Sequence, residues 1–323
     1  MVAGPADSPA IDVANVRRSY GSTIALDGLT LEVQAGEVHA LLGRNGAGKT
    51  TLIRLLSGLV QPTDGICRIA GVDVRGAPRA VRRLVGLVPS GDRSFYLRLS
   101  ALENLVFFGR LHGFRKREAR ERGLAALEQV GLTDVALQPM NTYSHGMQKR
   151  VSVARALLVD PPVLLVDEAT HDLDPEGAVQ IRELIRTAAE RGAAVLWATQ
   201  RVEEIRGFAD RVTVLELGRA RFAGTVAQLL SRTGASRFVV TLAANGAAKT
   251  PSLETLERSL GDLGRIAPTG ATDGTYLIAL SDSATLGNAL AALHGADAEI
   301  LACRHERPEV EEAFLALVGD GAS

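Results

Sequence analysis

The segment Gly43–Thr50 reads GRNGAGKT. It fits G-x-x-x-x-G-K-[ST] at every fixed position; an apolar run ending at Leu42 precedes it, and Thr51–Leu56 continues as a helix pattern. Glycines let successive backbone N–H groups curl around a phosphate, and a helix start adds partial positive charge. A Gly-rich turn with a chance lysine is the weaker interpretation, because the whole motif occurs in the right context. The stretch predicts a phosphate-binding loop.

Two acidic residues follow a second apolar run. Val163–Val166 (VLLV) leads directly into Asp167 and Glu168, which places two carboxylates at the end of a buried strand, where α/β sheets bind ligands. Lys49 of the phosphate loop would reach the β- and γ-phosphates, and the Thr50 hydroxyl would bind Mg²⁺. Asp167 suits a Mg²⁺ contact through water, and Glu168 suits a general base that polarises the attacking water. Alone the pair is a weak signal, but the upstream loop makes it strong.

Short apolar runs alternate with helical patterns from residue 11 to about residue 230. The runs expected to be strands are Glu37–Leu42, Val85–Val88, Val163–Val166 and Ala194–Trp197. Continuous apolar runs that end in polar or Gly-rich turns are typical of strands covered on both faces of a parallel sheet. The stretch from about 100 to 160 has helical periodicity instead and predicts a helical subdomain. Trp197, the only Trp, is expected in the core.

A second, smaller domain is expected at 237–323, after a flexible tail (1–10) and a polar linker (231–236, SRTGAS). Its strand and helix patterns fall at Arg237–Leu242, Leu253–Leu263, near Arg265, and at Thr275–Leu280, Leu286–Leu293, Glu299–Arg304 and Val310–Val318. This order predicts a ferredoxin-like βαββαβ unit. The expected fold class is therefore α/β: a P-loop domain with a helical subdomain, followed by a small α+β domain for regulation or dimerisation.

Composition limits the choice of partners. The chain has 323 residues, of which 46% are apolar and 23% charged, and a formal net charge of −1. A net charge this close to zero produces no overall field that would attract nucleic acid, so no nucleic-acid partner is expected. No run of about 18 apolar residues occurs and no secretory pattern is visible, so a membrane role is expected to depend on a partner. Cys67 and Cys303 fit no metal spacing and are expected to be reduced thiols of a cytosolic protein.

Further motifs single out one class of P-loop protein. Tyr143–Arg150 (YSHGMQKR) resembles the signature, usually L-S-G-G-Q, of ABC-transporter ATPase subunits. Tyr20, followed by a glycine, is similar to the family's adenine-stacking aromatic residue, and His171–Pro175 (HDLDP) resembles its D-loop. The resemblance covers residues 11–230, with the motifs in the family's order. The ending Arg307–Leu315 (RPEVEEAFL) resembles the C-terminal extension of exporter ATPases of the daunorubicin-resistance type.

The resemblance implies site residues, cofactors and partners. ATP would contact Tyr20, Gly43, Arg44, Asn45, Gly46, Ala47, Gly48, Lys49, Thr50, Thr51, Ser144, Gly146 and Gln148. Thr50 and, through water, Asp167 would hold Mg²⁺, and Glu168, Gln200 and Ser90 would be catalytic. The family's signature serves the nucleotide of the other protomer, which implies a nucleotide-sandwich dimer with a second copy or a related ATPase. An integral-membrane permease would hold the chain at the cytoplasmic face of the membrane, and ATP-dependent dimer closure would drive export through it.

Three positions depart from the family pattern. The Q-loop usually reads Val-Pro-Gln, whereas here Ser90 is too short for that reach, so a bridging water or Asp92 would have to compensate. Gln200 replaces the switch His, and an amide donates a hydrogen bond but carries no charge. His145 replaces a signature Gly and is expected to face solvent rather than the phosphate. A misplaced water or lost charge-assisted bond costs ~1–3 kcal/mol, which predicts slow but measurable hydrolysis.

Two alternatives stay open. The chain is either a transporter motor or a nucleotide-gated regulatory ABC protein with little hydrolysis, which the Ser90 and Gln200 changes allow. A translation or DNA-repair ABC protein ranks last, because the chain has one ATPase unit and no long coiled coil. The segment Arg93–Leu99 (RSFYLRL) either receives a short helix of the permease or packs inside the helical subdomain.

Overall fold

The computed structural model describes residues 8–91, 95–171, 173–231, 237–243, 251–269, 274–281, 284–296, 298–306 and 314. Asp92, Arg93, Ser94, Asp172 and most of the expected linker and final helix lie outside the described residues. The chain forms two compact units, Met1–Val226 and Ala227–Ser323. Ser231, which the sequence assigned to the linker, ends helix α7 (Val226–Ser231). None of the described helices has both the length and the apolar character needed to cross a membrane.

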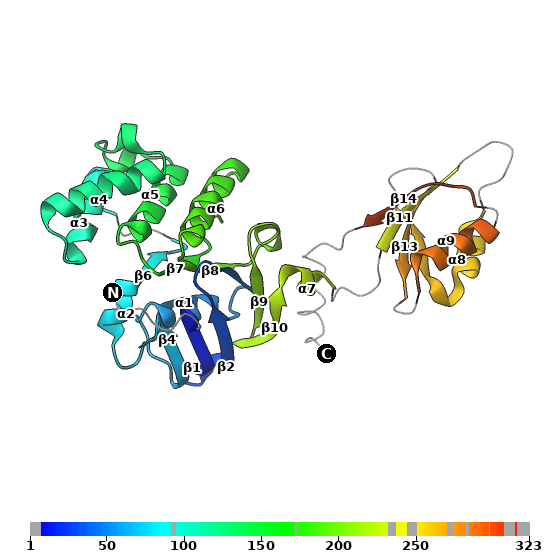
Figure 1. The fold of residues 1–323 in the computed structure, drawn as a ribbon, viewed down its shortest axis with the longest axis horizontal. Coiled ribbons are helices and arrows are strands. Elements are labelled where there is room, and N and C mark those ends of the chain that lie inside the picture. Colours follow the sequence, from blue (N-terminus) through cyan, green and yellow to red (C-terminus); the bar gives the residue numbers. More distant parts are fainter. Residues whose placement is uncertain are drawn as a thin grey trace. The chain divides into compact units, whose positions relative to one another are not determined.

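A six-stranded sheet forms the centre of the first unit, in the order β10-β9-β3-β8-β7-β6 (Figure 1). Its strands are β3 (Val38–Leu42), β6 (Val85–Val88), β7 (Val163–Asp167), β8 (Ala194–Thr199), β9 (Arg211–Glu216) and β10 (Arg219–Thr225). All neighbours are parallel except β9 and β10. The apolar runs that predicted strands are β3, β6, β7 and β8, so the α/β prediction is confirmed.

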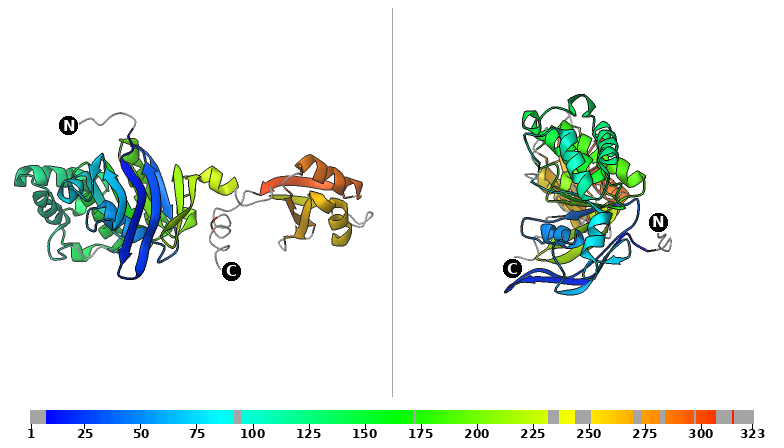
Figure 2. Two further views of the ribbon diagram at one scale, coloured as in Figure 1. Left: turned by 90° about the horizontal axis from the view of Figure 1, so that it is seen from below. Right: turned by 90° about the vertical axis from the view of Figure 1, so that its left-hand side faces the viewer.

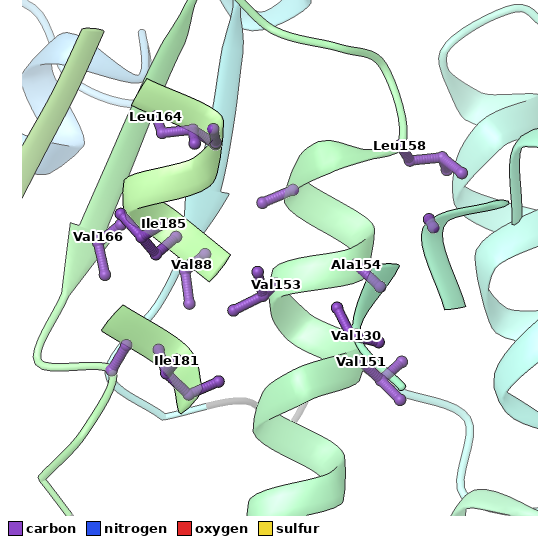
Figure 3. Packing of buried hydrophobic residues seen from close by; sticks show 14 of the residues in the cluster. Val88, Val130, Val151, Val153, Ala154, Leu158, Leu164, Val166, Ile181 and Ile185 are labelled. Atoms are coloured by element: carbon purple, nitrogen blue, oxygen red, sulfur yellow. The ribbon is translucent and has the colours of Figure 1, made fainter. Parts of the chain in front are cut away.

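Side chains of β7 alternate between two hydrophobic clusters. Val163 and Leu165 contribute to the cluster that contains helix α1 (Lys49–Leu56), and Leu164 and Val166 contribute to the cluster on the opposite face. Figure 3 shows that opposite face, where α5 (His145–Leu157) and α6 (Pro175–Glu190) lie side by side against the strands, with α5 in contact with β6 and α6 in contact with β8. Because both faces are covered, the strand is apolar throughout until the site begins at Asp167.

An antiparallel sheet packs beside α1, in the order β2-β1-β4-β5. Its strands are β1 (Ile11–Tyr20), β2 (Thr23–Val33), β4 (Asp64–Ile69) and β5 (Val72–Asp73), and helix α2 (Pro78–Leu84) follows. The two long blue strands β1 and β2 run side by side in Figure 2. This sheet brings β2 against the start of α1, where the phosphate loop lies.

The predicted helical subdomain consists of α3 (Ala101–Leu111), α4 (Lys116–Gln129) and α5, with 3₁₀ turns Thr133–Val135 and Met140–Thr142. Helix α3 begins with a capping box, in which Ser100 Oγ accepts from the Glu103 N–H and the Glu103 carboxylate accepts from the Ser100 N–H at 2.8 Å. These reciprocal bonds satisfy backbone donors that a helix start leaves open.

After α7, the described strands and α-helices of the second unit follow the predicted β-α-β-β-α-β order. They are β11 (Arg237–Leu242), α8 (Leu253–Leu260), β12 (Gly264–Pro268), β13 (Thr275–Leu280), α9 (Leu286–Gly295) and β14 (Ile300–Glu306). The antiparallel sheet order is β12-β13-β11-β14, and apolar residues of both helices pack with those of the strands. Helix α8 stops at Leu260, three residues earlier than predicted, and Gly261–Leu263 forms a 3₁₀ turn.

Candidate active site

The phosphate loop joins the end of β3 to α1 and is packed too tightly for side chains at two of its glycines. A Cβ on Gly43 would lie 2.6 Å from Leu215 O, and one on Gly48 would lie 2.6 Å from Ala25 O. Gly48 also has φ +110°, a conformation that L-residues rarely adopt. Backbone from β9 and β2 therefore confines the loop. Among its other residues, Arg44, Asn45 and Gly46 are exposed, Ala47 is buried and Thr51 is half-buried.

Lys49 lies inside the curve of the loop. Its side chain is 5% exposed, and Nζ donates to Gly43 O at 2.7 Å and to Arg44 O at 3.3 Å. The same nitrogen lies 3.4 Å from Glu168 Oε1. The structure therefore brings together the predicted phosphate-binding lysine and the predicted general base, from two different strand ends.

Asp167 and Thr50 form the part of the site that fits a metal ion. Thr50 Oγ1 donates to Asp167 Oδ2 at 3.1 Å, whereas Asp167 Oδ1 is buried and accepts no hydrogen bond within the described structure. Burial raises the pKa of Asp167 and the neighbouring Glu168 charge adds to this, against the opposing effects of Thr50 and Lys49. An unpaired buried carboxylate oxygen beside a hydroxyl matches the hard oxygen ligands that Mg²⁺ or its bound water prefers.

Glu168 has an unusual backbone for its residue type. Its φ is +47°, and its N–H donates to Ala198 O at 2.9 Å. Non-glycine residues in the left-handed region store of order 1–3 kcal/mol of strain, which the surrounding contacts must hold in place. This turn directs the main chain out of β7 immediately after Asp167 and leaves the Glu168 side chain 21% exposed, next to Lys49.

Gln200 and Ser90 follow β8 and β6, the two strands that flank β7 in the sheet. Thr199 O, just before Gln200, accepts from the Gly43 N–H at 3.2 Å, so the end of β8 contacts the phosphate loop. Gln200 is half-buried, and its amide makes no hydrogen bond to the described residues. Ser90 is exposed, and its main-chain oxygen accepts from Lys149 Nζ at 2.6 Å. The structure thus ties Ser90 to the signature helix and shows no contact of its hydroxyl with Asp167.

The signature residues stand at the start of α5. Ser144 is the N-cap, and its Oγ accepts from the Met147 N–H at 3.2 Å, while Ser144 and His145 are exposed. Gly146 helps to line a groove of about 350 Å³ that reaches the first turn of α6. Gln148 behaves differently, because its amide donates to main-chain oxygens of the preceding turn, at 3.3 and 3.4 Å. Gln148 therefore braces the signature turn from within its own subdomain.

Tyr20 ends β1 and has a 43% exposed side chain, as a base-stacking residue requires. The Arg18 guanidinium lies 4.3 Å from the ring centroid, a cation–π contact that the sequence did not reveal. Arg18 Nη1 also donates to Gln61 O at 3.1 Å. The contact orients the tyrosine ring at the end of the β1–β2 hairpin.

Sequence reasoning missed two buried charged residues near the site. Lys149, next to the signature residues, is 3% exposed and donates to Pro89 O at 3.1 Å as well as to Ser90 O. Glu204 is 6% exposed and bonded to residues of β8 and of the loop after β7. The sequence carries no signal for either residue, because Lys and Glu are expected on the surface; only the tertiary contacts identify these two.

The fold and the site define a P-loop ATPase. The family model described as ABC transporter matches residues 26–171. The chain is 38% identical over 319 residues to the daunorubicin resistance ATP-binding protein DrrA3 of Streptomyces coeruleorubidus, covering 96% of each chain. It is 36% identical to the daunorubicin/doxorubicin resistance ATP-binding protein DrrA of Streptomyces peucetius, covering 97% of this chain and 93% of that one. With the Nod factor export ATP-binding protein I of Rhizobium meliloti it shares 39% identity, covering 66% and 63%.

Solved structures agree with the sequence relatives. CbiO1 from Clostridium perfringens, described as part of the ABC transporter complex cbiONQ, is 27% identical with a TM-score of 0.65, covering 70% of this chain and 92% of that one. The dimeric bacterial ABC transporter cassette MJ0796 is 28% identical with a TM-score of 0.59, covering 67% and 98%. This chain belongs to the ABC transporter family, as an ATP-binding and ATP-hydrolysing subunit. The resemblance seen in the sequence is confirmed, and the regulatory alternative is not favoured.

Proposed function

We propose that this chain is the motor of an exporter, in which two ATPase protomers close around ATP and drive a separate permease. The observation that carries the proposal is an incomplete site. Lys49, Thr50, Asp167 and Glu168 meet at one edge of the central sheet, whereas Ser144 stands at the start of α5 and makes no described hydrogen bond to that group. A second protomer would supply the missing signature, and a relative of known structure is described as a dimeric cassette.

The proposed hydrolysis uses each residue in one role. The amides of the phosphate loop and the Lys49 ammonium hold the phosphates; Thr50 and Asp167 would hold Mg²⁺, which would supply positive charge beside them. Glu168, whose Oε1 lies 3.4 Å from Lys49 Nζ, accepts a proton from the attacking water. Gln200 donates to the γ-phosphate. Ser90 offers no comparable reach, so we expect slow turnover by the chain alone.

The permease is proposed to dock where the helical subdomain meets the central sheet. A groove of about 280 Å³ is lined there by Leu59, Leu87, Phe108, His112, Arg155 and Val159, among others. Exposed apolar residues extend it: Tyr96 and Phe107 meet edge to face at 5.1 Å, and Leu111 is 68% exposed. In the described part of Arg93–Leu99, Phe95 is buried against Phe108, as the packing alternative expects, whereas Tyr96 is exposed and is proposed to contact the permease. An apolar groove of this kind suits a short helix.

The remaining proposals concern location and the second unit. Docking on a permease would place the chain at the cytoplasmic face of the membrane, consistent with relatives named for resistance and export.

The unit after the linker is proposed to be ferredoxin-like, since its βαββαβ order and antiparallel β12-β13-β11-β14 sheet fit that fold. We propose that it regulates or stabilises the dimer. Domain bounds of 11–230 and 237–323 are part of this proposal.

The decisive experiment measures Mg-ATP turnover by the purified full chain together with its oligomeric state. Glu168→Gln should abolish turnover and should accumulate an ATP-dependent dimer on a size-exclusion column with light scattering. Glu183→Gln is the matched control, because Glu183 lies on α6 away from the site, and it should behave as the parent chain does. Turnover that survives Glu168→Gln would refute the assigned base. ATP-dependent dimers without any turnover would favour the nucleotide-gated alternative instead.

A further inference from the structure

A buried carboxylate outside the proposed catalytic set connects two loops of the site. Glu204 ends the 3₁₀ turn Val202–Glu204 and is 6% exposed. Thr170 Oγ1 donates to its Oε1 at 2.5 Å, and Thr199 Oγ1 donates to its Oε2 at 2.8 Å. The indole N–H of Trp197 donates to Oε2 at 3.3 Å. The only Trp of the chain thus lies in the core, as expected, and also holds this carboxylate.

The donors to Glu204 come from different strand ends. Thr170 is two residues beyond the general base Glu168, and Thr199 immediately precedes Gln200. Thr199 Oγ1 also accepts from the Arg201 N–H at 2.9 Å, so one hydroxyl joins the carboxylate to the main chain on the far side of Gln200. The loop that carries the base and the loop that carries the switch residue are therefore bonded to the same buried group.

Arg201 makes a second connection between these loops. Its Nη2 donates to His171 O at 3.0 Å, and its Nη1 lies 4.0 Å from Glu204 Oε1. His171 begins the stretch that resembles the D-loop. Arg201, the residue directly after Gln200, thus contacts the segment that leads from Glu168 towards the expected dimer interface.

We propose that Glu204 is a positioning residue for ATP hydrolysis, which fixes the separation between Glu168 and Gln200. The proposal rests on the proposed function. Gln200 has no charge with which to attract a γ-phosphate, so its effect depends on where its amide is held. A fully bonded buried carboxylate holds such a loop firmly, because losing it leaves the hydroxyl and indole donors without partners.

The test compares Glu204→Gln with Glu203→Gln, since Glu203 lies on the same turn and is exposed. Glu204→Gln should lower kcat by roughly tenfold to a hundredfold, the range for a catalytic group displaced by about an ångström, with ATP binding unchanged. Glu203→Gln should match the parent. Loss of ATP affinity and of kcat in parallel, tracking a loss of folded protein, would overturn the positioning role.

A double-mutant cycle separates positioning from a general structural role. If Glu204 acts through Gln200, Glu204→Gln should have almost no further effect on single-turnover hydrolysis in a Gln200→Ala chain. Multiplicative effects of the two substitutions would refute the proposal. Should Glu204→Gln fail to fold, Thr170→Val replaces it, with Thr170→Ser expected to restore the rate because it restores the donor. If the parent chain shows no ATP turnover that Glu168→Gln abolishes, the proposed function is refuted, and this inference with it.

Discussion

Replacing Gly48 by alanine should separate the geometry of the phosphate loop from the general stability of the fold. The added Cβ would lie 2.6 Å from Ala25 O and 3.0 Å from Leu26 Cδ2. Ala25 O belongs to the backbone of β2, and this strand cannot shift easily because it is paired with β1 in a sheet. The loop must therefore move, and with it the amides that would hold the phosphates.

The magnitude follows from two contributions. A non-glycine residue at φ +110° carries of order 1–3 kcal/mol of strain, and relief of the collision displaces the amides from the phosphate. Since about 1.4 kcal/mol corresponds to a factor of ten in affinity, we expect Gly48→Ala to bind ATP roughly ten- to a hundredfold more weakly. Gly192→Ala is the matched control: Gly192 has φ +104°, no atom within 4 Å of the added Cβ, and a place in the turn after α6.

The assay is titration of each purified variant with a fluorescent ATP analogue and Mg²⁺, next to urea unfolding of the same samples. Both variants should unfold at lower urea concentration because they share the backbone strain, but only Gly48→Ala should lose affinity. Parent-like binding by Gly48→Ala would refute the argument from loop geometry. Equal loss of affinity in Gly192→Ala would show that binding merely follows stability.

Three further outcomes are expected. Burial raises the pKa of Asp167, so its ionised form opposes folding at pH values above that pKa. Asp167→Asn should therefore raise the Tm of the nucleotide-free chain at pH 8, as measured by calorimetry, and this increase should become smaller as the pH falls. Lys149→Met should cost about 1–3 kcal/mol in urea unfolding through lost charged hydrogen bonds, whereas Lys116→Met, at an exposed site, should be neutral. Phe95→Ala should cost about 3–5 kcal/mol, whereas Tyr96→Ala should cost only about 0.5–1.5 kcal/mol, through its ring contact with Phe107, and should reduce stimulation of turnover by the permease.

Much of the fold could be predicted because it is encoded in continuous stretches. The runs that form β3, β6, β7 and β8 are apolar throughout, since helices cover both faces of the sheet. The order β3-β8-β7-β6 was not predictable, because side-chain patterns report burial but do not identify the neighbouring strand. That order decides which strand ends, and so which loops, meet at the site.

The two aromatic residues Phe95 and Tyr96 show the limit of local patterns. They are adjacent in the sequence and both aromatic, yet Phe95 is 8% exposed and Tyr96 is 52% exposed. Packing of Phe95 against Phe108, at 6.1 Å between ring centroids, decides this difference. No periodicity in a short loop predicts which of two neighbours will find such a partner.

The sequence by itself determined the class of protein, because Gly43–Thr50 and the pair Asp167 and Glu168 are contiguous motifs whose chemistry depends on local backbone form. The hydrogen bonds from Thr170 and Thr199 to Glu204, and the bond from Lys149 to Ser90 O, follow only from the tertiary structure. These contacts join residues far apart in the chain or on different elements. Their partners are set by strand order and burial, and a buried charge is recognised only once the groups that compensate it are known.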